Sequence, residues 1–165
     1  MSGGWPTATL GPVARARALA ASIPSAAWAE GILDAPYDVT WRWVRDLEVS
    51  VPQFDSQVTR LQVIERRADD GAERLRIKAW SMGIGLPFDV RLEEGYCLMQ
   101  ARARLYLVVM AAEPHDDARK TRFFHVEAIP LPGAALMRRA IVRGVRADIA
   151  NLTRLARQGF SDVVD

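Results

Sequence analysis

The sequence lacks the features that build disulfides, membrane-spanning helices and cysteine-based metal sites. Cys97 is the only cysteine in 165 residues, which excludes a disulfide within the chain and a cysteine-based zinc site. No segment approaches the ~20 consecutive apolar residues that span a bilayer, and residues 1–6 lack the cationic start and apolar stretch of a signal peptide. We therefore expect a cytoplasmic protein with no integral membrane association.

A large excess of one charge is also missing. The 22 basic residues nearly balance the 20 acidic residues. A nucleic-acid-binding protein would gather its cations on one face, whereas acidic residues interrupt most of this sequence, so we expect no nucleic-acid partner. The exception is the C-terminal segment, where Asp148 is the single acid on a predicted solvated helix face that carries Arg138, Arg139, Arg143, Arg146, Arg154 and Arg157.

Composition and length indicate one folded domain. Half of the residues are apolar and a quarter are charged, as in globular proteins, and a chain of this length buries roughly two-thirds of its surface on folding. Residues 1–24 are rich in Gly, Pro, Ala and Thr, so we interpret them as a partly ordered N-terminal arm whose Trp5 could meet a partner. The domain itself is expected at 25–160, followed by a C-terminal tail at 161–165.

Alternating hydrophobicity predicts an antiparallel sheet that is interrupted early by two helices. We expect a first strand at 26–33 and two short helical segments at 36–46 and 47–55. The period then falls to two, which is typical of half-buried antiparallel strands, in six segments: 58–67, 74–80, 88–94, 96–103, 105–112 and 119–129. Pro130 and Pro132 end the sheet, because proline cannot continue a central ladder.

A long C-terminal helix is predicted for residues 134–158. Its apolar residues recur at helical spacing and predict the face that packs on the sheet, formed by Met137, Ile141, Val145, Ile149, Leu152 and Ala156. Gly144 lies in the middle of this helix, where glycine costs roughly 1 kcal/mol relative to alanine. We therefore expect a close backbone approach or a bend at Gly144.

Residues 35–54 carry a local pattern of small, apolar and aromatic residues. Its members are Ala35-Pro36, Thr40-Trp41, Val44, Asp46, Pro52 and Phe54. This pattern resembles the first helical segment of the START-like (SRPBCC) superfamily, which commonly has an aliphatic residue where this chain has Thr40. The resemblance covers about twenty residues by motif and residues 25–158 by order of elements, so it is specific for fold and not for activity.

The resemblance implies an α+β helix-grip fold, in which a curved seven-stranded antiparallel sheet wraps around the long C-terminal helix and two short helices follow the first strand. Members of the superfamily bind lipids, sterols, polyketides or plant hormones between sheet and helix, and some are polyketide aromatase/cyclases. We therefore expect a hydrophobic ligand in an internal cavity lined by Trp80, Met82, Phe88, Tyr96, Met99, Tyr106, Met110, Phe123, Met137, Ile141, Val145 and Ile149.

His125 and Glu127 are the candidate catalytic residues. On a strand they share one face with Phe123, whereas Phe124 and Val126 share the other face, so the sequence leaves the orientation open. If the Phe123 face points inward, His125 can act as a general acid or base, with Glu127 holding its tautomer. If that face points outward, the two residues are a polar pair on the solvated side.

Two functions therefore remain open from the sequence. The first is a carrier or sensor that binds a hydrophobic small molecule without chemistry, since no complete catalytic set can be read. The second is a polyketide cyclase or dehydratase-like enzyme, with His125 as acid/base and Tyr96 or Tyr106 as a donor to a developing enolate. A homodimer is also left open.

No cofactor and no metal site are expected. His115, Asp116 and Asp117 could bind a cation, but they follow Pro114 in a polar loop, where such residues are common for reasons of turn geometry. The segment 81–85 has two glycines between strands, yet it lacks the lysine and the following helix of a phosphate-binding loop.

Overall fold

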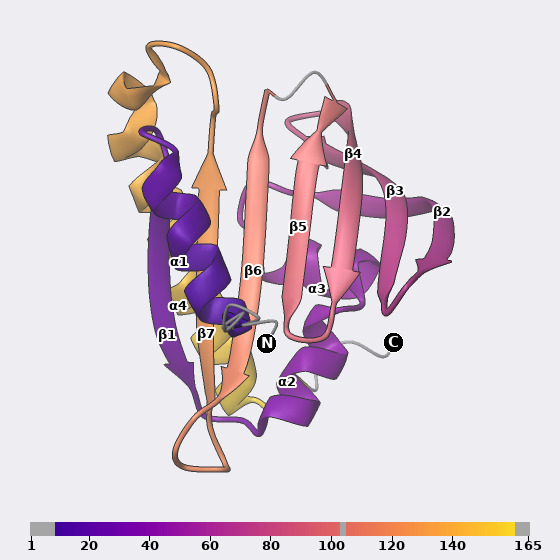
Figure 1. The fold of residues 1–165 in the computed structure, drawn as a ribbon, viewed down its shortest axis with the longest axis vertical. Coiled ribbons are helices and arrows are strands. Elements are labelled where there is room, and N and C mark those ends of the chain that lie inside the picture. The colour runs from indigo at the N-terminus through magenta and orange to yellow at the C-terminus, as the bar shows by residue number, and fades with distance from the viewer. Residues whose placement is uncertain (1–8, 103–104, 161–165) are drawn as a thin grey trace, which may run out of the picture.

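Seven strands form one antiparallel sheet in the computed structural model, which describes residues 9–102 and 105–160. The order across the sheet is β1-β7-β6-β5-β4-β3-β2 (Figure 1). The strands are β1 (Ala27–Leu33), β2 (Arg60–Asp69), β3 (Ala72–Ser81), β4 (Ile84–Glu93), β5 (Tyr96–Ala101), β6 (Leu107–Pro114) and β7 (Thr121–Ala128). Strands β2 to β7 are a consecutive meander, and β1 pairs with the last of them.

Helices cover both faces of the sheet. On the face that we call inner lie α2 (Tyr37–Val44), α3 (Leu47–Phe54) and the long α4 (Arg138–Arg157), which follows a short 3₁₀ helix, η2 (Ala134–Met137). On the opposite, outer face α1 (Pro12–Ser22) crosses β6 and β7 (Figure 1). None of the described helices is long and apolar enough to cross a membrane.

The predicted fold class is confirmed. Each predicted strand and each of the three predicted helices is present, with bounds that differ by a few residues. In β3 buried and exposed side chains alternate as predicted, because Leu75 and Ile77 are buried whereas Arg74 and Arg76 are exposed. The turn from β2 to β3 uses Gly71, whose φ of 79° is a conformation that glycine adopts without steric cost.

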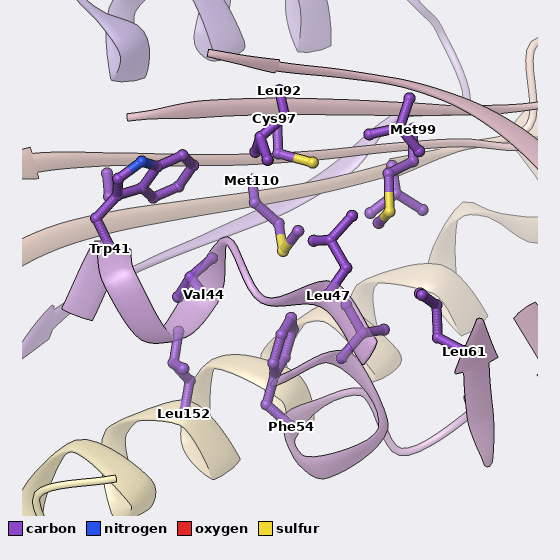
Figure 2. Close-up of a cluster of buried hydrophobic side chains, with 14 of the residues drawn as sticks. Trp41, Val44, Leu47, Phe54, Leu61, Leu92, Cys97, Met99, Met110 and Leu152 are labelled. Atoms are coloured by element: carbon purple, nitrogen blue, oxygen red, sulfur yellow. The ribbon is translucent and has the colours of Figure 1, made fainter. Parts of the chain in front are cut away.

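The main hydrophobic core fills the space between the inner face and the three inner helices. Figure 2 shows Leu47 and Phe54 of α3 with Met110 of β6 and Leu152 of α4 in this core. Each of these four side chains is at most 1% exposed. The helix α4 also packs directly on the sheet, mainly on β1 and to a lesser extent on β7.

The outer face has a second, smaller core under α1. Val13, Ala16 and Ala20 of α1 pack against outer-face residues of the sheet, among them Phe124 and Val126. The part of the predicted N-terminal arm between Pro12 and Ser22 is therefore a helix packed on the domain. Trp5 and the rest of residues 1–8, like the predicted tail at 161–165, lie outside the described residues.

Polar contacts also fasten α1 to the sheet, among them an ion pair of Arg17 with Glu30 of β1. The Glu113 carboxylate accepts a hydrogen bond of 2.9 Å from the backbone N–H of Val13, at the helix N-terminus. Arg15 forms an ion pair of 2.6 Å with Glu93 at the end of β4, and its guanidinium also lies over the ring of Tyr96. The helix is thereby held at both β4 and β6.

The buried face of α4 differs from the predicted stripe at Met137 and at Asp148. Ile141, Val145 and Leu152 are buried as expected. Met137 is 53% exposed, because it belongs to η2 and precedes the helix. The assignment of Asp148 to the solvated arginine face is wrong, since Asp148 is 1% exposed and lies on the buried face.

Candidate functional site

A cluster of ionisable side chains is buried where β7 meets α4. His125 and Glu127 lie two residues apart on β7 and are each 1% exposed, and Asp148 reaches them from α4. Phe123 of the same β7 face belongs to the main core. Of the two orientations left open by the sequence, the structure therefore has the inward one, with His125 facing the inner helices.

The three side chains converge on one nitrogen atom. Nε2 of His125 lies 3.3 Å from Oε1 of Glu127 and 3.4 Å from Oδ2 of Asp148. The other ring nitrogen, Nδ1, has no hydrogen-bond partner among the described residues. The ring of Phe54 meets the imidazole edge-on, with 5.9 Å between ring centroids, and so restricts its orientation.

Each carboxylate has its second oxygen held by a separate donor. The Tyr106 hydroxyl donates to Oε2 of Glu127. The backbone N–H of Ser56 donates to Oδ1 of Asp148 over 3.2 Å, and the Ser56 hydroxyl lies 3.4 Å from the same oxygen. These contacts fix both carboxylates so that Oε1 and Oδ2 face His125.

Burial and neighbouring groups shift the pKa values of side chains in and beside the cluster. Burial alone would lower the pKa of His125, but its contacts with Asp148 and Glu127 outweigh this and raise the pKa to about 10. Burial would likewise raise the pKa of Glu127, yet His125 beside it lowers the pKa overall. For Asp55, burial together with the charges of Asp148 and Glu127 raises the pKa to about 6.

A narrow cavity lies beside this cluster. It has a volume of about 40 Å³ and is lined mainly by apolar side chains of α3 and of strands β2 to β6. The lining consists of Val51, Asp55, Val58, Leu61, Ile77, Ala79, Phe88, Met99, Tyr106 and Val108. Its two polar members are Asp55 and Tyr106, and Tyr106 also contacts Glu127 of the cluster.

Comparison with known proteins identifies the fold. No protein-family model and no curated protein matches the sequence. Solved structures do match. An 18 kDa protein from Caulobacter crescentus is 18% identical, with a TM-score of 0.62, over 81% of this chain and 96% of that protein. A START superfamily protein from Mycobacterium smegmatis is 14% identical, with a TM-score of 0.59, over 81% of this chain and 97% of its own. The Zhui aromatase/cyclase from a Streptomyces species is 15% identical, with a TM-score of 0.59, over 83% of this chain and 96% of that protein.

The chain has the START-like fold. This confirms the resemblance at residues 35–54 at the level of fold, because identities of this size carry no information on substrate or reaction. The START-like architecture also explains why the cluster and the cavity are neighbours, since both lie between the inner face of the sheet and the helices that cover it.

Some of the predicted ligand-binding residues lie in this START-like interior. Phe88, Met99 and Tyr106 line the cavity. Met110 and Phe123 are fully buried in the surrounding core and do not reach the cavity wall. Three of the predicted residues therefore lie at the cavity wall, and their role in ligand binding stays a prediction.

The other predicted ligand-binding residues lie elsewhere. Tyr96 is in the outer core under α1, Trp80 contacts Lys78 and Arg60 outside the inner core, and Met82 is 91% exposed in a turn. On α4, Ile141 and Val145 pack on Ala27 of β1, Ile149 lies against Gly31 of β1, and Met137 is exposed. None of these seven residues lines the described cavity.

Two site residues were missed by sequence reasoning. Asp148 falls three residues after Val145 and four before Leu152, so it occupies a position of the apolar stripe, and a lone acid on such a stripe is the signal that could have found it. Asp55 ends α3 directly after the buried Phe54. Nothing in its sequence neighbourhood distinguishes it from an ordinary polar residue at a helix end.

The arrangement offers two kinds of chemistry. Asp55 and Tyr106 present a carboxyl and a hydroxyl to anything inside the cavity, and burial and the charge of Glu127 raise the pKa of Tyr106, so its hydroxyl remains a hydrogen-bond donor. Behind Tyr106, one imidazole and two carboxylates present the ligand atoms from which metal sites are also built. His115 takes no part, because its Nδ1 accepts a hydrogen bond from the backbone of Asp117 in a surface turn.

Proposed function

We propose that the protein binds a hydrophobic small molecule with an oxygen-bearing end in the cavity between β2–β6 and α3. The observation that carries the proposal is the composition of the cavity wall, in which Asp55 and Tyr106 are the only polar members of an otherwise apolar lining. Small-molecule sites typically have this character, with a few placed polar groups that orient the ligand. A hydroxyl or carbonyl group of the ligand would meet Tyr106 and Asp55.

The size of the cavity limits how such a ligand can enter. About 40 Å³ has room for roughly two or three water molecules, whereas sites for drug-sized ligands enclose about 300–1,000 Å³. Binding of a lipid, sterol or polyketide-like molecule therefore requires side chains of the wall to move. Met99 is suited to such movement, because its unbranched side chain has three rotatable bonds.

A cyclase or dehydratase-like reaction is the second candidate function. It is favoured by the placement of Asp55 and Tyr106 together on the wall, where both could touch a bound polyketide-like substrate. His125 does not line the cavity and lies behind Tyr106, so its predicted role as the acid/base would require a rearranged wall. On this alternative, His125 and Glu127 are positioning residues that act through Tyr106.

Ligand binding can be tested with the full chain purified from cells. Native mass spectrometry would reveal a co-purifying apolar molecule, and titrations with fluorescent fatty-acid and sterol probes would measure affinity. Ala79→Leu should fill part of the cavity and weaken binding at least tenfold, whereas Met82→Ala, in an exposed turn, should leave it unchanged. Absence of any apolar ligand, or equal effects of the two substitutions, would overturn the proposal.

The catalytic alternative has its own measurement. Tyr106→Phe should leave binding of the fluorescent probe within a few-fold of the original chain but abolish cyclisation of a poly-β-ketone substrate followed by chromatography. Unchanged turnover in Tyr106→Phe and in His125→Ala would remove this mechanism while leaving the binding function intact.

A further inference from the structure

We propose that His125, Glu127 and Asp148 form a binding site for one divalent transition-metal ion, for which Zn²⁺ fits best. The ligand atoms would be Nε2 of His125, Oε1 of Glu127 and Oδ2 of Asp148. The proposal concerns a site separate from the apolar cavity, and its tests require no organic ligand.

His125 and Glu127 are within hydrogen-bonding distance of each other, and the spacing of the three groups also fits metal coordination. A charge-assisted bond between imidazolium and carboxylate is typically about 2.7–2.9 Å long, but the two separations here are 3.3 and 3.4 Å. Two ligands at about 2.1 Å from a tetrahedral Zn²⁺ lie about 3.4 Å from each other. The distance from Nε2 to each of the two oxygens is thus close to the ligand–ligand distance around a tetrahedral Zn²⁺ ion.

An unsatisfied acceptor points into the same space. Oδ2 of Asp148 is buried and has no hydrogen-bond donor among the described residues, although Oδ1 of the same carboxylate is bound by Ser56. A buried carboxylate oxygen without a donor is costly. A cation between Oδ2, Oε1 of Glu127 and Nε2 of His125 would satisfy it.

The charge of the cluster also calls for a cation. Two carboxylates are buried here, and within residues 9–102 and 105–160 no arginine or lysine pairs with either of them. A divalent cation placed between the two carboxyl groups would supply the positive charge that no neighbouring arginine or lysine side chain provides.

Hydrogen-bond donors around the cluster orient the two carboxylates, as donors next to the ligands do in known metal centres. Tyr106 holds Oε2 of Glu127 and Ser56 holds Oδ1 of Asp148, so each carboxylate is oriented with its other oxygen toward His125. Such partners fix ligand geometry and raise metal affinity. One nitrogen and two carboxylate oxygens suit Zn²⁺, and they are also accepted by Mn²⁺, Fe²⁺ and Co²⁺.

Metal binding to the whole chain tests the proposal. Chelator-treated protein would be titrated with Zn²⁺ by calorimetry, the bound metal counted by plasma mass spectrometry, and the site probed with Co²⁺, whose visible absorption reports low coordination number. We expect one ion per chain and a higher unfolding temperature when the ion is present. Glu127→Gln and Asp148→Asn, which keep side-chain shape, should each weaken binding at least ~100-fold, since loss of outer-shell partners alone costs about 10- to 100-fold.

The matched control uses the other histidine of the chain. His115→Ala should bind Zn²⁺ as the original protein does, because His115 lies in a surface turn apart from the cluster. Loss of binding in His115→Ala, or retention in both Glu127→Gln and Asp148→Asn with folding confirmed by circular dichroism, would overturn the proposal. So would the absence of a stoichiometric ion in the original chain, which decides the matter even if both carboxylate variants fail to fold.

Discussion

The hydroxyl of Tyr106, just before β6, donates a hydrogen bond to Oε2 of Glu127 on β7. This contact joins two parts of the interior that differ in character, because Tyr106 lines the apolar cavity and Glu127 belongs to the buried ionisable cluster. A molecule that displaced or rotated Tyr106 would therefore remove a donor from Glu127. Tyr106 thus links the cavity to the cluster.

Tyr106→Phe should destabilise the protein, because it leaves a buried carboxylate oxygen without its donor. We expect a loss of about 1–3 kcal/mol in the free energy of unfolding, measured by urea denaturation. Tyr37→Phe is a matched control, since Tyr37 also donates to a carboxylate, Oε1 of Glu94, but does so at the surface. Its loss should stay below about 1 kcal/mol, and equal losses would contradict the burial argument.

The fold could be predicted almost entirely from the sequence, because its signals are local or periodic. In β3 the alternation of Leu75 and Ile77 with Arg74 and Arg76 shows a sheet with one buried side. The proline pair at Pro130 and Pro132 correctly marked the end of the sheet. The packing of α1 on the outer face was missed, because Val13, Ala16 and Ala20 form a weak stripe of mostly small residues.

The site was predicted only in part, because it depends on contacts between distant segments. His125 and Glu127 were found from their spacing on one strand, although their orientation was not decided. Asp148 lies 21 positions beyond Glu127, and only the placement of α4 against β7 brings the two together. The stripe of α4 was drawn through Ile149, one residue away, which turned Asp148 toward solvent.

Stability should fall at acidic pH as α1 loses its contact with β4. The ion pairs of Glu93 with Arg15 and Arg91 lower the pKa of Glu93 to about 2 from its ordinary value near 4.5. A depressed carboxyl pKa contributes stability that is present above the unfolded value and is lost as pH falls from about 4.5 toward 2. The free energy of unfolding measured across this range should decrease.

Glu93→Gln isolates that contribution. The variant should be less stable than the original chain at pH 7, with a difference that shrinks toward pH 2, where Glu93 of the original chain is itself protonated. Asp38→Asn is the control, because Asp38 forms only a long, exposed pair of 3.9 Å with Arg42. A difference for Glu93→Gln that stays constant with pH would contradict this account.

Gly31→Ala should destabilise the contact between β1 and α4. A Cβ atom at Gly31 would lie 2.8 Å from Cγ2 of Ile149, so α4 would have to shift. We expect a loss of about 1–3 kcal/mol, as for other overpacked sites. The double variant Gly31→Ala/Ile149→Ala should lose less than the sum of the two single variants, because Ile149→Ala removes the clashing methyl group. Additive losses in denaturation experiments would count against a direct clash.

Gly144→Ala should stabilise the protein, in contrast to Gly31→Ala. Gly144 lies within α4, and a Cβ atom there would meet only the end of the Gln57 side chain, at 2.9 Å, which can move aside. Alanine is favoured over glycine in a helix interior by about 1 kcal/mol, so we expect the free energy of unfolding to rise by up to that amount. A loss would show that Gln57 cannot be displaced.

The unequal coverage of the sheet has a dynamic consequence. Strands β6 and β7 are sandwiched between α1 and the inner elements, whereas β2 to β4 present charged side chains to water on their outer face. Backbone amides of β6 and β7 should accordingly exchange with deuterium last, and those of the β2–β3 hairpin first. Because Leu61, Ile77 and Phe88 of the weaker half form one wall of the cavity, transient opening of that half supplies a route by which the interior can widen without disturbing the buried cluster on β7.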